Sequence, residues 1–468
     1  MLGRAVTFAL LPLYTRVLAP DDFGALDLTL ALSAFALVTV AVEVTQGLAR
    51  TLPERADPAD QAAETGTALT FGALAYGAFL VLGLIAAPWA GSALFARPDG
   101  ATLISFGVAW VAFTGLLAIA QARLRFSLRP SAYAVSNGVL ALGSAVASAL
   151  LVLVLHFGAV GVLAGQVLGA VAALAISLRL AQPKPRFGID RARLRAMLAF
   201  SLPLVPASVA VIGASYADRV TVGALLGLGD LGVYGVAVRI AALVGVLVIG
   251  FQNAIVPLIY ANYRDPTTPS ALARLARLYV GGSIVLVAGL ALLGPEVVAI
   301  MATPAFGRAA VVLPLLASTV LLSSLANVAP GLAIERHTRP MAAIAIGCAV
   351  VTISLNLLLV PWFGITGAAL ASVAGAALTL FLTAALGQRR YRIPFDGPAI
   401  LAGALVAGVV VAGTTVVAPA PGQDVPLRFG VMIIAVGLVI AIGLVRVSEL
   451  VAAARGLGQL ISRWGRGA

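Results

Sequence analysis

Long apolar runs follow one another along almost the whole chain, and they constrain its fold more than any other feature. Of its 468 residues, 61% are hydrophobic and only 10% are charged, whereas a soluble domain has about 25% charged residues. A run of about 20 apolar residues crosses the hydrocarbon core of a bilayer as a helix. The sequence therefore predicts an all-α polytopic membrane protein with no separate soluble domain.

Breaks at proline, glycine and charged residues divide the apolar runs into about fourteen segments of transmembrane length. The predicted spans are 3–18, 25–48, 66–89, 101–120, 132–155, 159–179, 199–226, 232–259, 275–294, 308–330, 341–360, 364–386, 397–418 and 428–446. Segments 189–198, 268–278 and 448–464 mix arginine and leucine at helical spacing. This pattern is typical of helices that lie on a membrane surface, and we expect these three on the cytoplasmic side.

The basic residues predict how the spans are oriented. If the N-terminus is cytoplasmic, 24 of the 30 lysines and arginines fall in the even-numbered connections and the two tails. Four fall on the opposite side, and Arg219 and Arg239 lie inside spans. Because cytoplasmic loops carry an excess of basic residues, we expect both termini in the cytoplasm. The same bias explains the net charge of +12 without a nucleic-acid partner.

The sequence has few residues that could form a metal site, a disulfide or a nucleotide-binding loop. Cys348 is the only cysteine, and His156 and His337 are isolated at predicted helix ends. An intrachain disulfide is therefore excluded, and no metal site is expected. The phosphate-loop motif G-x-x-x-x-G-K-[ST] is absent from the sequence, so we do not expect a nucleotide-driven pump.

Two stretches of the chain repeat each other at an offset of 206 residues. HFGAVGVLAGQVLGAVAAL (156–174) aligns with WFGITGAALASVAGAALTL (362–380), and both keep small residues at four-residue spacing. Such spacing lets helix backbones approach closely in lipid. RPSAYA (129–134) likewise matches RPMAAI (339–344), and Arg16 and Gly24 match Arg219 and Gly232 at offsets of 203 and 208.

These offsets predict two related halves of six spans each, residues 1–190 and 195–390, with two further spans within 395–447 and an amphipathic tail at 448–468. Each half has an even number of spans, so both run in the same direction through the membrane. Transporters built from such repeats bind substrate between the halves and expose it to each side in turn. The organisation therefore favours a transporter that works by alternating access.

Charged and polar residues interrupt or border several predicted spans. They are Arg16, Asp27, Glu43, Gln46, Arg50, Asp218, Arg219, Arg239, Gln252 and Asn253. A charge in mid-bilayer costs roughly 2.5–3.5 kcal/mol, so it usually faces protein or water. Two interpretations stay open here. Asp218 and Arg239 form a structural bridge across the hairpin 212–243, or the polar faces line a central cavity whose arginines suit a phosphate-bearing ligand.

Three stretches carry a resemblance to a known family. PLYTRVLAPDDFGALDL (12–28), followed by Glu43 and GLAR (47–50), resembles the start of bacterial polysaccharide-biosynthesis flippases of the Wzx type. The segment 203–240, with PLVP and ADRVTVGALLGLGDLGVYGVAVRI, is similar to their second-half signature, and PWFGITGAALA (361–371) to their junction of spans 11 and 12. These flippases share the MOP superfamily with multidrug MATE exporters and the lipid II flippase.

The resemblance implies movement of an undecaprenyl-diphosphate-linked oligosaccharide from the cytoplasmic to the periplasmic leaflet of the bacterial inner membrane. It implies two helical bundles facing a cavity, with spans 13 and 14 forming a lipid-facing groove beside it. The candidates for substrate binding in this cavity are Arg16, Gln46, Arg50, Arg219, Arg239, Gln252 and Asn253. The resemblance also implies coupling to protons or sodium ions through Asp27, Glu43 or Asp218, and contact with membrane lipids and the polysaccharide polymerase machinery.

Two other classes of protein fit the sequence less well. A MATE-like ion-coupled drug or metabolite antiporter would have a less cationic cavity and no purpose for the last two spans. A polysaccharide polymerase, ligase or glycosyltransferase would need acidic residues, arginine or histidine on sizeable outward loops. The outward loops here are short, at 96–100, 156–158, 225–231 and 362–364. We therefore expect a transporter and not an enzyme.

Overall fold

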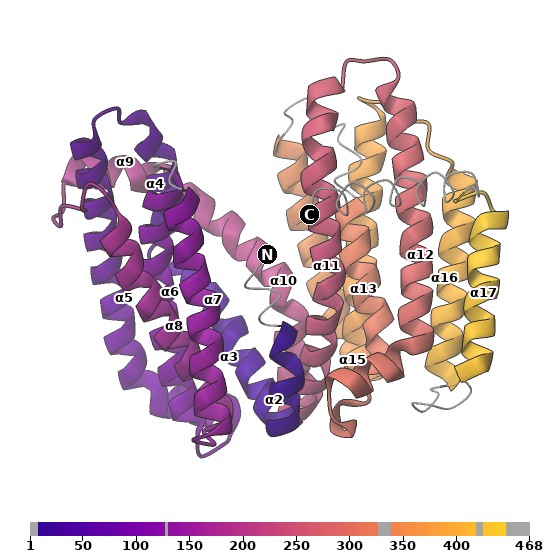
Figure 1. The fold of residues 1–468 in the computed structure, drawn as a ribbon, viewed down its shortest axis with the longest axis horizontal. Helices are drawn as coiled ribbons and strands as arrows, with labels where there is room; N and C mark the ends of the chain where they lie inside the picture. Colours follow the sequence, from indigo (N-terminus) through magenta and orange to yellow (C-terminus); the bar gives the residue numbers. More distant parts are fainter. Residues whose placement is uncertain (1–7, 127–129, 326–337, 418–424, 446–468) are drawn as a thin grey trace, which may run out of the picture. The chain divides into compact units, whose positions relative to one another are not determined.

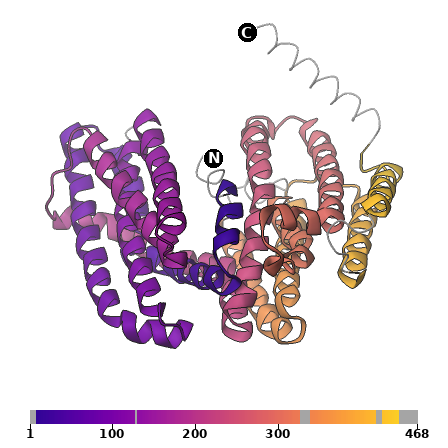
Figure 2. The ribbon, with the colours of Figure 1, turned by 60° about the horizontal axis from the view of Figure 1, so that its bottom comes forward.

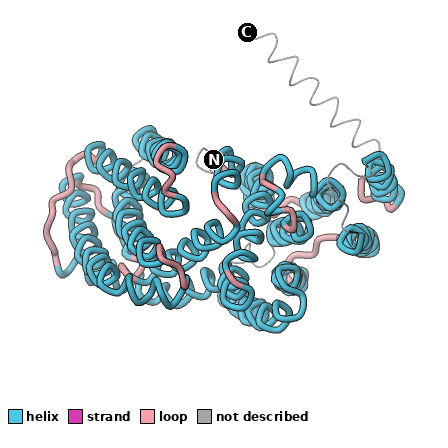
Figure 3. Tube along the Cα trace, turned by 90° about the horizontal axis from the view of Figure 1, so that it is seen from below, coloured by secondary structure: helices cyan, strands magenta, loops and turns pink. Residues whose placement is uncertain are grey.

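The computed structural model describes residues 8–126, 130–325, 338–417 and 425–445, and the regular structure in these ranges is helical (Figure 3). Nine of the described helices are long and apolar enough to cross a membrane, and three shorter ones are also apolar. The predicted all-α, polytopic membrane fold is therefore confirmed. The predicted surface helix at 448–464 lies outside the described residues.

The helices follow the predicted spans closely. Their bounds are α2 Leu11–Val17, α3 Pro20–Thr39, α4 Val44–Thr51, η1 Leu52–Glu54, α5 Pro58–Phe95, α6 Gly100–Phe126, α7 Pro130–Leu153, α8 Gly158–Leu180, α9 Arg191–Ser201, η2 Leu202–Leu204, α10 Val205–Leu226, α11 Leu228–Asn262, α12 Thr268–Met301, η3 Pro304–Phe306, α13 Ala309–Leu325, α15 Thr338–Gln388, α16 Gly397–Val417 and α17 Val425–Ala441 (Figure 1). The total of fourteen spans stays a prediction.

Local chemistry explains several helix boundaries. Asp22, in the first turn of α3, accepts a hydrogen bond from the backbone N–H of Ala19, which precedes the helix. Asp57 and Asp190 precede α5 and α9, and each accepts from N–H groups in the first turn of its helix. Such caps satisfy N–H groups that have no partner within the helix. In α15, Gly364 adopts φ 60°, which divides the helix into the two arms predicted at 341–360 and 364–386.

The described contacts divide the chain into two compact units. Unit 1 contains residues 1–239, 301–306 and 345–371, and unit 2 contains residues 240–300, 307–344 and 372–468. In unit 1, α5, α6, α7 and α8 lie side by side (Figures 1 and 2). Side chains at Gly165 and Gly169 of α8 would overlap Ser148 and Ser144 of α7. The small residues of the sequence repeat therefore do allow close helix packing.

In unit 2, the last two described helices pack against α12. Val280 and Ile284 of α12 form one buried cluster with Ala399 of α16 and Val439 of α17. Arg428 of α17 is buried, and its guanidinium donates to the Leu292 carbonyl and to Glu296 Oε1 at 3.3 and 2.6 Å. The two further spans predicted after the halves are thus anchored by apolar packing and a partly buried ion pair. Their predicted role as a lipid groove beside a cavity stays a prediction.

Candidate functional site

Three charged side chains meet inside unit 1, where α3, α10 and α11 come together. Asp27 of α3 lies 2.9 Å from Arg239 Nη2 on α11 through its Oδ1 atom. Its Oδ2 atom lies 3.3 Å from Arg219 Nε on α10. The Asp27 carboxylate therefore contacts two guanidinium groups, which come from two other helices that are distant from α3 in the sequence.

Two glycines bring α3 and α11 close enough for this contact. A Cβ on Gly24 would overlap the carbonyl oxygen of Leu228, and a Cβ on Gly232 would overlap that of Pro20. The contact is reciprocal, because Pro20 and Leu228 are separated by the same 208 residues as Gly24 and Gly232. Self-complementary contacts of this kind arise across a two-fold axis, and they support the predicted repeat at this offset.

The two copies of the repeat differ at the positions of the charged residues. At the same offset Asp27 corresponds to Gly235, and Ala31 corresponds to Arg239. A Cβ on Gly235 would lie 3.0 Å from Asp27 Oδ2. Gly235 thus leaves room for the Asp27 carboxylate. Asp27 comes from the first copy of the repeat, and Arg239 comes from the second.

Asp218 has different partners from those predicted. Its Oδ2 atom accepts a hydrogen bond of 2.7 Å from the Tyr234 hydroxyl, and its Oδ1 atom accepts one of 2.8 Å from the Arg219 backbone N–H. The Asp218–Arg239 bridge, one of the two interpretations that the sequence left open, is therefore wrong, because the carboxylate that reaches Arg239 belongs to Asp27 on a third helix. Equal depth on a hairpin does not make two side chains face each other.

Aromatic rings hold both guanidinium groups in place. The Arg219 Cζ atom lies 4.7 Å from the Tyr216 ring centroid, and the Arg239 Cζ atom lies 4.3 Å from that of Phe23. Such cation–π contacts contribute roughly 0.5–2 kcal/mol each, depending on their desolvation. The two side chains are still 17% and 22% exposed, and Arg239 Nη1 has no hydrogen-bond partner among the described residues. This Nη1 atom is itself buried, so the exposed part of the Arg239 side chain lies elsewhere on it.

The charges of this cluster balance. Arg219 and Arg239 face Asp27 and Asp218, so two bases stand against two acids. The predicted excess of positive charge is therefore not carried by these four residues. A negatively charged ligand would have to compete with Asp27 for the arginines.

The other predicted site residues are described within each unit by itself. In unit 1, Arg16 is exposed in the last turn of α2, Gln46 is exposed on α4, and exposed Arg50 pairs with Glu54. In unit 2, Gln252 donates to the Ser324 carbonyl at 3.5 Å, and Asn253 is exposed on α11. A cavity shared by these residues stays a prediction.

Glu43 lies at a break in the second predicted span. The chain leaves helical geometry between α3 and α4, and both Val42 and Glu43 have positive φ values, 42° and 56°. The Tyr76 hydroxyl donates to the Leu37 carbonyl at 3.2 Å, near the end of α3. A Cβ on Gly115 would overlap the Tyr76 ring, so the glycine makes room for the tyrosine that supports the break.

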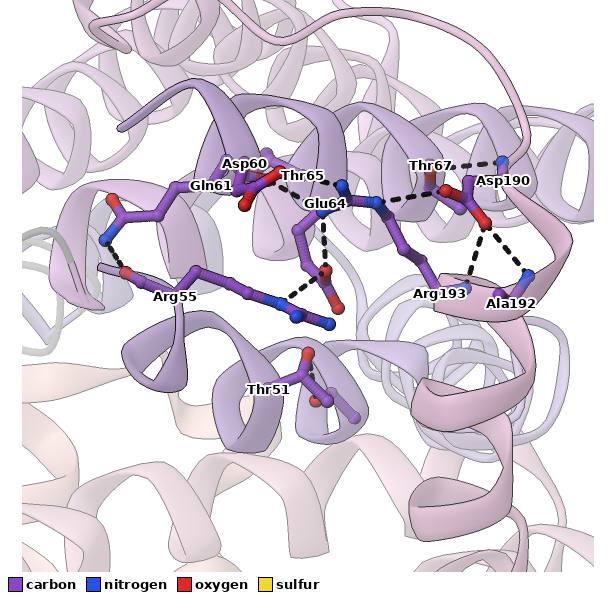
Figure 4. A network of polar contacts seen from close by, with 11 residues as sticks. Thr51, Arg55, Asp60, Gln61, Glu64, Thr65, Thr67, Asp190, Ala192 and Arg193 are labelled. Carbon is purple, nitrogen blue, oxygen red and sulfur yellow. Dashed lines mark hydrogen bonds and ion pairs between the residues drawn. The ribbon is translucent and has the colours of Figure 1, made fainter. Parts of the chain in front are cut away.

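A second polar network lies at the start of α5 and was missed by reasoning from the sequence (Figure 4). Glu64 is fully buried, and its Oε2 atom lies 3.3 Å from Arg55 Nε and 3.2 Å from Arg193 Nη1. Arg193 also pairs with Asp60 and Asp190, at 2.8 and 3.1 Å. The hydrogen bond from the backbone N–H of Arg193, reinforced by that from its guanidinium, lowers the pKa of Asp190. The only sequence signal was an acid just before an apolar run.

This network fixes the connection between the two predicted halves. Buried Arg123 of α6 donates to Gln61 Oε1 at 2.6 Å and to the Gln182 carbonyl at 3.3 Å. The Arg186 backbone N–H donates to the Ala62 carbonyl, at 3.2 Å. The segment after α8 is thus bound to α5 and α6, which is a structural role. Residues 191–201 form a helix, as predicted for 189–198; its place on the membrane surface stays a prediction.

Comparison with known proteins gives a family for this chain and solved structures with a similar fold. A family model described as "Polysaccharide biosynthesis protein" matches residues 13–269, more than half of the chain. No curated protein matches the sequence. The fold is similar to an inward-facing multidrug resistance MATE family transporter of the MOP superfamily, with a TM-score of 0.69 at 16% identity over 83% of this chain and 94% of that one.

Two further solved structures share the fold. The lipid II flippase MurJ, in an inward closed conformation, gives a TM-score of 0.66 at 12% identity, over 93% of this chain and 98% of that one. A MOP superfamily transporter from Pyrococcus furiosus gives 0.55 at 15% identity, over 84% and 93% of the two chains. At these identities the likeness concerns the fold alone.

Proposed function

Because this chain belongs to the polysaccharide biosynthesis protein family and has the fold of MOP superfamily transporters, we propose that it is a flippase for lipid-linked oligosaccharides. The cargo is an undecaprenyl-diphosphate-linked glycan, which moves from the cytoplasmic to the periplasmic leaflet by alternating access. The chain is a multi-pass membrane transporter and not an enzyme. We place it in the bacterial inner membrane, with both termini in the cytoplasm and with the polymerase machinery as a partner.

The observation that carries this proposal is the pair of arginines held by Asp27. Arg219 and Arg239 point to the same carboxylate, and both remain partly exposed. Guanidinium groups bind phosphate oxygens in pairs, and a diphosphate offers several oxygens at once. The diphosphate would take the place of the Asp27 carboxylate between the two arginines.

Replacement of the Asp27 carboxylate by the diphosphate would give Asp27 a role in coupling ion binding to substrate binding. While the site is empty, the carboxylate neutralises both arginines. A proton or sodium ion bound to Asp27 would weaken the ion pairs between Asp27 and the two arginines. The arginines would then be able to bind the phosphate. Among the three predicted ion-coupling candidates, Asp27 thus has the most direct link to the arginines, whereas Asp218 is engaged by Tyr234 and Glu43 lies at the helix break.

One observation favours the alternative, a MATE-like ion-coupled drug or metabolite antiporter. The charges of the Asp27 cluster balance, whereas a strongly cationic site would suit only anionic cargo. Loss of the gene separates the two functions: a flippase mutant lacks surface glycan, while an antiporter mutant keeps its glycan and becomes more susceptible to drugs.

The direct test replaces Arg219 or Arg239 by alanine in the host cell. We expect either variant to lose most of the surface glycan and to accumulate lipid-linked glycan in the cytoplasmic leaflet, at normal amounts of membrane protein. Arg179→Ala is the matched control, because this arginine is exposed in the last turn of α8. Normal surface glycan in both site variants would overturn the proposal.

A further inference from the structure

A short segment from the second half of the chain is docked onto the first helices of unit 1. Residues Met301–Phe306, the end of α12 and the turn η3, belong to unit 1, although the chain on both sides of them belongs to unit 2. The Thr15 hydroxyl of α2 donates to the Met301 carbonyl at 2.8 Å, and the Thr303 hydroxyl donates to the Thr15 carbonyl at 3.4 Å. Reciprocal hydrogen bonds therefore tie this segment to α2.

Phe306, the last residue of the segment, packs against α3. Its side chain is fully buried, and Phe23 of α3 is only 1% exposed. The two ring centroids lie 5.8 Å apart, and the ring planes cross at 71°. Aromatic pairs prefer this edge-to-face arrangement, so the Phe306 ring restrains the tilt of the Phe23 ring.

The Phe23 ring also contacts the charged cluster. The Arg239 Cζ atom lies 4.3 Å from its centroid, and Arg239 Nη2 lies 2.9 Å from Asp27 Oδ1. Phe23 and Asp27 are four residues apart, so they share one face of α3. The ring and the carboxylate therefore set the position of the same guanidinium group together.

We propose that Phe306 is a positioning residue for Arg239 and acts on it through the Phe23 ring; this inference rests on the proposed function for its phosphate-bearing cargo. While the segment Met301–Phe306 is docked, Phe306 fixes the Phe23 ring and the ring fixes the guanidinium. If the segment left α2 and α3, the ring would lose this support and the arginine would lose its place. The affinity of the site for phosphate thus depends on the docked segment, which gives the transporter a way to release its cargo.

Binding of inorganic pyrophosphate to the purified full chain tests the positioning role. Phe306→Leu removes the ring but keeps an apolar side chain, and we expect the dissociation constant to rise about threefold to tenfold. Phe95→Leu is the matched control, because Phe95 is a buried phenylalanine at the end of α5. The control should lose a similar amount of melting temperature and keep the wild-type dissociation constant. A wild-type constant in Phe306→Leu, or an equal rise in both variants, would overturn the inference.

A double-mutant cycle on melting temperature tests the same ring contacts without a ligand. Phe306→Leu and Arg239→Gln share Phe23 as a partner, so we expect the double variant to lose less than the two single variants together. Phe95→Leu combined with Arg239→Gln should be additive. Additive losses for Phe306 and Arg239 would overturn the inference. A wild-type protein that does not bind pyrophosphate would count against the proposed function, and the cycle would still decide the role of Phe306.

Discussion

At the scale of single residues, Asp27 matters most, because it is the shared partner of two arginines. Buried charges are costly to desolvate, and removing one member of a buried pair leaves the other uncompensated, at about 3–5 kcal/mol. Both arginines here keep some exposure, so the cost falls at or below the lower end of this range.

Asp27→Asn should therefore destabilise the protein more than Asp218→Asn. An asparagine at 218 can keep one of the two hydrogen bonds that Asp218 accepts, whereas Asp27→Asn removes the carboxylate charge that both guanidinium groups share. We expect Asp27→Asn to lower stability by about 2–3 kcal/mol and inorganic pyrophosphate to restore its melting temperature. Thermal unfolding of both purified variants checks this. Equal melting temperatures for Asp27→Asn and the wild type would contradict the assigned role.

The sequence singled out the charged residues of this cluster, but it did not predict their contacts. Asp27, Asp218, Arg219 and Arg239 stand out because charge is rare in apolar spans. Their pairing depends on how α3 is rotated against α11, and that rotation follows from the glycine contact at Gly24, which no periodicity reveals. Depth along a hairpin could therefore suggest a wrong partner for Arg239.

At the scale of helices, the break between α3 and α4 is the main departure from the predicted pattern. The segment VAVE (40–43) contains no glycine or proline and reads as part of one continuous span. The structure places two non-glycine residues there in the left-handed region, where each costs about 1–3 kcal/mol. The support comes from Tyr76 and Gly115, on helices far away in sequence, so local propensity could not predict it.

Val42→Gly tests the break directly. Glycine adopts positive φ without the steric cost of a β-branched residue, so we expect stability to rise by about 0.5–1 kcal/mol. Val40→Gly is the matched control, because Val40 has φ −62° and glycine there should lower stability by roughly 0.5 kcal/mol. The melting temperatures of the two variants check this prediction. A lower melting temperature for Val42→Gly than for Val40→Gly would show that the backbone at residue 42 is not strained.

At the scale of the whole molecule, the polytopic helical fold follows from composition and from the spacing of the apolar runs. The pairing of Gly24 with Leu228 and of Gly232 with Pro20 adds a physical contact to the predicted repeat. The burial of Glu64 between Arg55 and Arg193 could not be predicted, because positive-inside counting treats each of these arginines as a loop charge.

The predicted orientation is tested by accessibility from outside the cell. A cysteine-containing tag after Gly227 should react with a membrane-impermeant maleimide in intact cells, because it follows the outward end of α10. The same tag after Pro185 should react only after lysis. Replacing Cys348 by serine beforehand removes the only native thiol. Labelling of the second tag but not the first in intact cells would reverse the topology.

The central claim is that this chain moves a diphosphate-linked glycan across a bilayer through Arg219 and Arg239. The most direct measurement is leaflet-resolved translocation of an undecaprenyl-diphosphate-linked glycan in proteoliposomes, with a soluble glycosidase that reaches only the outer leaflet. The account predicts transfer by the wild-type protein and at least a tenfold loss in Arg239→Ala, with Arg179→Ala unchanged. Equal transfer by the wild type and Arg239→Ala, or none above protein-free vesicles, would contradict it.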